Sequence, residues 1–140
     1  MSRKWIDVLG SSDAGGGQSS RQAKCTVDVP VTTLDQMIYE CGMPYYVKID
    51  VEGFELEVIW GLSQAVPLLS VECNLPHFCN ETLEIVKKLS DLSSLIRFNF
   101  VTTEPPLKFE ADDWLEANEI IPIVESGRHT YLELYARPVS

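Results

Sequence analysis

The most informative segment of the sequence for the fold is Tyr45-Tyr46-Val47-Lys48-Ile49-Asp50-Val51-Glu52-Gly53-Phe54-Glu55. Its first part, 45–51, is rich in aromatic and β-branched residues, which predicts a strand. Glu52-Gly53 is typical of a turn, because glycine adopts the backbone angles that tight turns need. A short helix is expected from Phe54 to Leu62, since apolar residues four apart share one face of a helix. The stretch therefore predicts a strand, a turn and a helix in succession.

The segments on both sides continue this alternation. Upstream, Val27, Val29 and Val31 alternate with other residues and predict a short strand, which Pro30 confines to a sheet edge. Thr33 is a good N-cap for a helix that ends at Gly42. Downstream, the apolar patterns predict strands over 68–72, 95–101 and 131–136, and helices over 80–92 and 111–118. This order predicts an α/β fold in which strands 45–51 and 68–72 are parallel.

Composition excludes several classes of partner. The net charge is −10, whereas nucleic acids and anionic membranes require clustered Lys and Arg. No apolar run reaches the roughly 18 residues of a membrane-spanning helix, and the N-terminus lacks the apolar core of a signal peptide. We therefore expect a cytoplasmic protein with free thiols. Residues 1–24 are rich in Gly and Ser, which predicts a flexible segment ahead of one domain over 25–140.

Four segments of the chain together resemble the FkbM family of S-adenosylmethionine-dependent methyltransferases. They are Val29–Asp35, Val47–Glu55, Gly61 and Pro67–Glu72, and Lys-Ile-Asp-Val-Glu-Gly at 48–53 is the most distinctive. The resemblance is strong over about 25–75. It implies a Rossmann-like sheet whose last strand is antiparallel, with strands 46–51, 68–72, 95–101 and 131–136 as the fourth to seventh.

The resemblance also implies an activity, which is methyl transfer from S-adenosylmethionine to an oxygen, often a hydroxyl of a sugar or natural product. In the family, a glycine-rich turn after strand one and an acidic residue ending strand two bind the cofactor. Neither is found upstream of residue 25. We therefore expect only the C-terminal part of such a domain, inactive in isolation, with no residue assigned to the cofactor. Three interpretations remain open: a fragment of a methyltransferase, a non-catalytic binding module, or a half-enzyme completed by another chain.

Candidate site residues follow two neighbouring strands. Asp50 ends one strand, and Glu72 and Asn74 end the next, at the sheet edge where α/β proteins bind ligands. Asp50 is the candidate catalytic residue that faces the methyl donor or the acceptor hydroxyl. Oxygen ligands of this kind suit Mg²⁺, and the arrangement is similar to that of metal-dependent O-methyltransferases, so Asp50, Glu72 and Asn74 are candidate metal ligands. His77 is a candidate general base.

Each of these roles has a structural alternative. Lys48 and Asp50 share a strand face and can form an ion pair, with Glu52 capping the next helix. Glu72 can be simply solvated, and His77 can be an exposed loop residue. The sequence leaves both interpretations open.

A last expectation concerns assembly. In the family sheet the fourth strand is central and pairs with the first, which is not recognised in this sequence. Strand 46–51 would then have one unpaired edge, and such edges recruit other strands. We expect a homo-oligomer or a completing chain joined near 45–52, besides a small-molecule hydroxyl acceptor.

Overall fold

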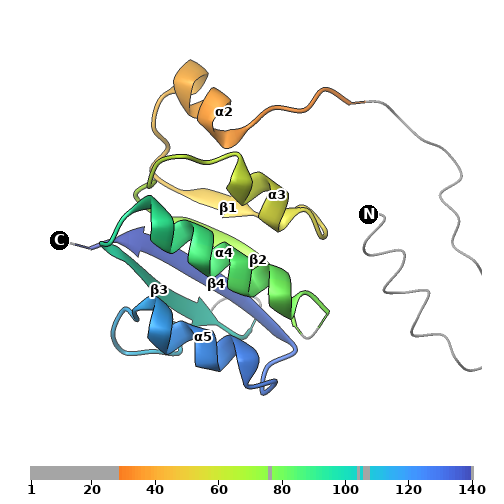
Figure 1. Cartoon of the computed structure of the whole chain (residues 1–140), viewed down its shortest axis with the longest axis vertical. Coiled ribbons are helices and arrows are strands. Elements are labelled where there is room, and N and C mark those ends of the chain that lie inside the picture. Colours follow the sequence, from red (N-terminus) through yellow and green to blue (C-terminus); the bar gives the residue numbers. More distant parts are fainter. Residues whose placement is uncertain (1–28, 76, 104, 106–107, 140) are drawn as a thin grey trace, which may run out of the picture.

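A computed structural model describes residues 29–139 except 76, 104, 106 and 107. These described residues form four helices and four strands, which alternate along much of the described sequence (Figure 1). They are α2 (Leu34–Cys41), β1 (Val47–Ile49), α3 (Glu55–Trp60), β2 (Leu69–Asn74), α4 (Cys79–Leu92), β3 (Ile96–Val101), α5 (Ala117–Glu125) and β4 (Tyr131–Pro138). No helix among the described residues has the length and apolarity needed to cross a bilayer.

The four strands form one sheet in the order β1-β2-β4-β3. β1 and β2 are parallel, with Ile49 beside Val71, which confirms the prediction for these two strands. The last strand, β4, lies between β2 and β3 and is antiparallel to both. The α/β class is thus confirmed, with an antiparallel last strand as expected.

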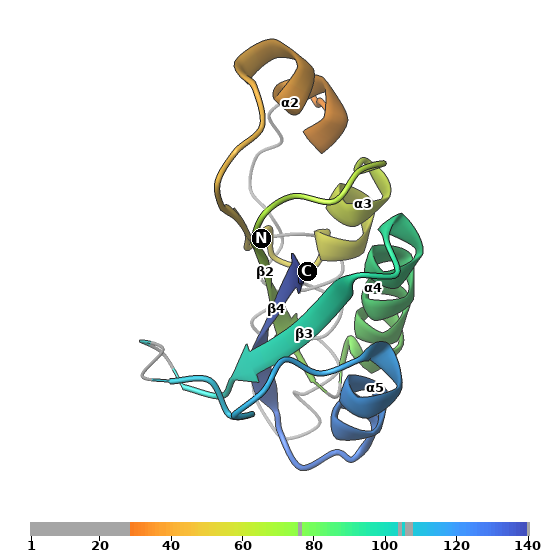
Figure 2. The same cartoon turned by 90° about the vertical axis from the view of Figure 1, so that its left-hand side faces the viewer.

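Helices α3, α4 and α5 all lie on the same face of the sheet (Figure 2). The apolar side chains of alternating strand residues point toward them, because successive side chains of a strand point to opposite faces. The centre of this layer is fully buried and includes Val71, Phe98 and Leu134 from the sheet and Ile59 and Ile120 from the helices. This core fixes the sheet and therefore the positions of the strand ends.

Helix α2 is different, because none of its residues is buried. It lies beyond β1, one of the two edge strands of the described sheet (Figure 1). Thr33 caps it as predicted, accepting a hydrogen bond from the Gln36 amide at 3.2 Å. Asp35 ties it to the end of α3 by accepting from the Ser63 amide at 2.9 Å and donating its own amide to the Gly61 carbonyl. The helix is therefore attached at its first turn.

Two predicted elements are wrong. Val29, Pro30 and Val31 belong to no strand, and Val31 is 94% exposed, while Val27 lies outside the described residues. The last helix occupies 117–125 instead of 111–118. Residues near 111–115 are kept out of a helix by tertiary contacts, since Leu115 exchanges two backbone hydrogen bonds with Phe98. Pro122 concealed the true helix, whose buried face consists of Ile120 and Val124.

Candidate functional site

The turn after β1 has an unusual backbone. Glu52 has φ 55° and Gly53 has φ 92°, so a non-glycine residue occupies the left-handed region. Such a conformation costs free energy and persists where the surroundings impose it. Here the carboxylate of Glu55 imposes it, accepting hydrogen bonds from the amides of Val51 at 3.2 Å and Gly53 at 3.0 Å. Glu55, which the sequence interpretation did not single out, is thus the residue that shapes this turn, rather than Glu52.

Asp50 lies directly before this turn at the carboxyl end of β1 and is exposed. Its Oδ2 is 3.8 Å from Nζ of Lys48, and both side chains are partly exposed. The Lys48–Asp50 ion pair that the sequence suggested as a structural alternative is therefore present. An exposed pair of this kind contributes little to stability, so Asp50 is available for contact with a ligand.

Glu72 and Asn74 end β2, the neighbouring strand. The Asn74 amide donates to the Glu72 carboxylate at 3.2 Å. Both residues border a cavity of about 10 Å³. That volume is close to what one water molecule needs. Within the described part of the chain, no group of three or more His, Cys, Asp or Glu side chains is arranged to hold a metal ion. The Mg²⁺ site is therefore unsupported, and the roles of Asp50, Glu72 and Asn74 stay predictions.

Cys73 borders the same small cavity. Burial raises the pKa of its thiol to about 12, although a hydrogen bond with Thr82 opposes the shift. The thiol is protonated at neutral pH, so Cys73 is neither a nucleophile nor a thiolate ligand there.

His77 lies exposed in the connection between β2 and α4. The connection follows the carboxyl end of β2, on the same side of the sheet as the turn after β1. Its role as a general base stays a prediction.

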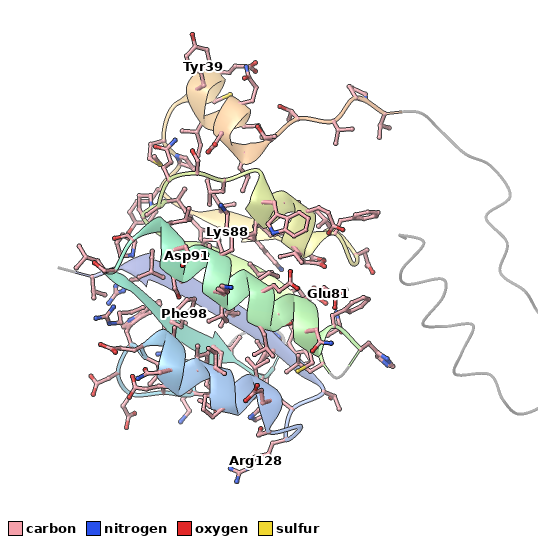
Figure 3. The ribbon with its side chains drawn as sticks, viewed as in Figure 1. Tyr39, Glu81, Lys88, Asp91, Phe98 and Arg128 are labelled. Carbon is pink, nitrogen blue, oxygen red and sulfur yellow. The ribbon has the colours of Figure 1, made fainter. Side chains whose placement is uncertain are left out.

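A groove of about 540 Å³ runs between α2 and the β1–α3 unit. Its size is within the range of small-molecule sites. The polar lining residues include Thr33, Tyr46, Lys48 and Glu57. Apolar side chains make up most of the wall, and these are Leu34, Met37, Ile38, Val47, Ile49, Val51 and Val58. Tyr39 points away from the groove and from the rest of the molecule (Figure 3).

A buried polar cluster lies on the face of the sheet away from the helices. Its centre is Glu133, which is 4% exposed and accepts a hydrogen bond from Ser70 Oγ at 2.6 Å. The hydroxyl of Tyr46 lies 2.5 Å from the same Ser70 oxygen. Burial and the charge of Glu133 raise the pKa of Tyr135, whose hydroxyl is within hydrogen-bonding reach of Glu133 and Tyr46. No local sequence pattern predicts this cluster, because its members come from three segments of the chain.

Comparison with known protein families shows a match over much of the chain. The profile of the family described as "Methyltransferase FkbM domain" matches residues 5–96. This range includes the β1 turn and begins ahead of the 25–75 region in which the resemblance was strongest. No curated protein and no solved structure matches the chain.

Proposed function

This chain belongs to the FkbM methyltransferase family, and we propose that it takes part in transferring a methyl group from S-adenosylmethionine to a hydroxyl of a small molecule. The observation that carries the proposal is the family's hexapeptide, Lys48–Gly53, at the carboxyl end of a parallel strand. Ligands of α/β proteins bind at such strand ends.

The sheet supports a more detailed correspondence. We assign β1, β2, β3 and β4 to the fourth, fifth, sixth and seventh strands of the family domain. This assignment is supported by the parallel pairing of β1 with β2 and by β4 being antiparallel to both of its neighbours. In this assignment the chain supplies the C-terminal part of a Rossmann-like sheet.

The described residues do not fit the cofactor at this edge. The cavity beside Glu72 and Asn74 holds about 10 Å³, far less than a nucleoside-containing molecule needs. We therefore propose that the described part of the chain forms the acceptor side of the active site, which binds the methyl acceptor. The cofactor side would come from a second copy or a completing chain placed beside β1.

In this proposal Asp50 orients the hydroxyl of the methyl acceptor. Its carboxylate, at the strand end, would accept a hydrogen bond from the acceptor hydroxyl and so orient the oxygen. Methyl transfer depends mainly on such alignment. Mg²⁺ is not part of the proposed mechanism, since Asn74 donates to Glu72 and Asp50 pairs with Lys48.

We predict that Asp50→Asn lowers methyl transfer by about 100-fold, the lower range for loss of a positioned acid–base group. The variant is expressed in its native cells, which contain any completing chain. Label transferred from S-adenosylmethionine to extracted small molecules is then measured.

Asp91→Asn is the matched control, because Asp91 is an exposed carboxylate on α4, away from the strand ends (Figure 3). Unchanged transfer by Asp50→Asn, or an equal loss in both variants, would contradict the role of Asp50. Cells with the chain that show no transfer beyond cells without it would contradict the function itself.

The small cavity also favours a second candidate, a binding module without its own catalysis. The methyltransferase proposal and the binding-module proposal both predict that the isolated chain binds S-adenosylmethionine with a dissociation constant above the micromolar range. Isothermal titration calorimetry checks this prediction. A micromolar dissociation constant would show that residues of this chain form a cofactor site, and it would refute the division into acceptor and cofactor sides.

A further inference from the structure

The backbone that follows β1 is held by a side chain instead of by the sheet. Ile49 is the last residue of β1 and lies beside Val71 of β2. Val51 and Gly53 lie beyond the strand, and their amides donate to the same atom, Oε1 of Glu55, at 3.2 Å and 3.0 Å. Gly53 is buried, so the loss of this hydrogen bond would be costly there. Glu55 therefore continues, past the end of the strand, the fixing of the chain that the sheet provides up to Ile49.

Asp50 lies between these two attachments. On its N-terminal side, Ile49 is fixed in the sheet. On its C-terminal side, the Val51 N–H lies in the same rigid plane as the Asp50 carbonyl, because the peptide bond is planar. The hydrogen bond from Val51 to Glu55 thus sets the rotation of that plane, and with it the backbone angle ψ of Asp50. The backbone is therefore held on both sides of the Asp50 Cα, which fixes the direction in which the side chain leaves the chain.

The ion pair of Asp50 does not replace this control. Its carboxylate lies 3.8 Å from Nζ of Lys48, and both side chains are partly exposed, so the pair holds the carboxylate only weakly. The turn itself is strained, because Glu52 has φ 55°. Without the two hydrogen bonds to Glu55, the turn would relax and the Asp50 carboxylate would move.

On the basis of the methyl transfer proposed above, we propose that Glu55 is a positioning residue for that reaction. It acts through Asp50, by holding the turn that keeps the Asp50 carboxylate where the acceptor hydroxyl binds. The property that matters is an oxygen acceptor at the place of Oε1, which both amides use. Glutamine offers one such oxygen without the charge, whereas alanine offers none.

The first test is amide hydrogen exchange on the full chain, without S-adenosylmethionine. In Glu55→Ala the amides of Val51 and Gly53 should exchange at least about tenfold faster, the effect of losing a hydrogen bond to a charged group. Glu55→Gln should retain most of the protection. Unchanged exchange of both amides in Glu55→Ala overturns the proposal, whatever is found for methyl transfer.

The second test is the transfer of label from S-adenosylmethionine in the native cells, measured per amount of chain. Glu55→Ala should lower it roughly 10- to 100-fold, because a displacement of about 1 Å can cost about 100-fold. Glu55→Gln should retain most of the transfer. The double variant of Asp50→Asn with Glu55→Ala should be no slower than Asp50→Asn alone, because Glu55 then has no carboxylate to position. A loss caused only by weaker folding would instead multiply in the double variant.

Glu84→Ala is the matched control, because it removes the same carboxylate from an exposed position on α4. It should leave both measurements unchanged. Full transfer by Glu55→Ala, an equal loss in Glu55→Gln, or multiplied losses in the double variant would overturn the role of Glu55 while the proposed function stands. Absence of transfer in cells that contain the wild-type chain would refute the proposed function itself, and the positioning role with it.

Discussion

Phe98→Ala should lower the free energy of unfolding by about 3–5 kcal/mol, the usual cost of removing a buried aromatic side chain. Phe98 is fully buried in the sheet and is labelled between α4 and α5 in Figure 3. It pairs with Ala136 of β4 and exchanges two backbone hydrogen bonds with Leu115. Because domains are stable by only about 5–15 kcal/mol, this loss would remove a large part of the total. Urea denaturation followed by circular dichroism measures it.

Leu95→Ala serves as the control for this substitution. Leu95 directly precedes β3 and is half exposed, so its truncation should cost less than about 1 kcal/mol. If the two substitutions had equal effects, Phe98 would not occupy the centre of the core, and the arrangement of β3 against α4 and α5 would be wrong.

Asn99→Ala should cost about 2–4 kcal/mol, because it removes several hydrogen bonds of a buried amide at once. Asn99 is 1% exposed, and its Nδ2 donates to the carbonyls of Ala111 and Asp113. Its Oδ1 accepts from the amides of Phe100 and Ala111. The segment near 111–113 should therefore detach from β3. Hydrogen exchange at the Ala111 amide, together with urea denaturation, checks this expectation.

Asn118→Ala is the matched control, since it removes the same amide group from an exposed position on α5. It should change the unfolding free energy by no more than about 0.5 kcal/mol. An Ala111 amide that exchanges equally fast in the wild type and in Asn99→Ala would show that Asn99 does not hold this segment.

The elements that the sequence predicted well are those with local causes. The β-branched run near Val47, the Glu52-Gly53 turn and the Thr33 cap are properties of adjacent residues, and all three are present. The wrongly predicted elements are those whose structure depends on contacts with residues that are distant in the sequence. The stretch 111–115 has a helical pattern, but Asn99 and Phe98 form hydrogen bonds with its backbone and keep it from forming a helix.

The candidate site also has features that the local sequence predicts and features that only tertiary contacts determine. Asp50, Glu72 and Asn74 were placed at two neighbouring strand ends from the sequence, and parallel pairing of β1 with β2 does bring these ends to one edge. Whether they bind a metal ion depends on the direction of each side chain. That direction comes from tertiary contacts: Asn74 turns toward Glu72, and Asp50 turns toward Lys48.

The α/β class, the family and the strand-end position of Asp50 could be predicted without the structure, because periodicity, turn residues and a short motif are local features of the sequence. The position of β4 between β2 and β3, the hydrogen bonds of Ser70 with Tyr46 and Glu133, and the groove beneath α2 come from contacts between elements that are distant in the sequence. These features join residues that are far apart in the sequence, such as Ser70 and Glu133, which are 63 positions apart. The free energy that forms them comes from burial and hydrogen bonding between whole elements, which no local pattern records.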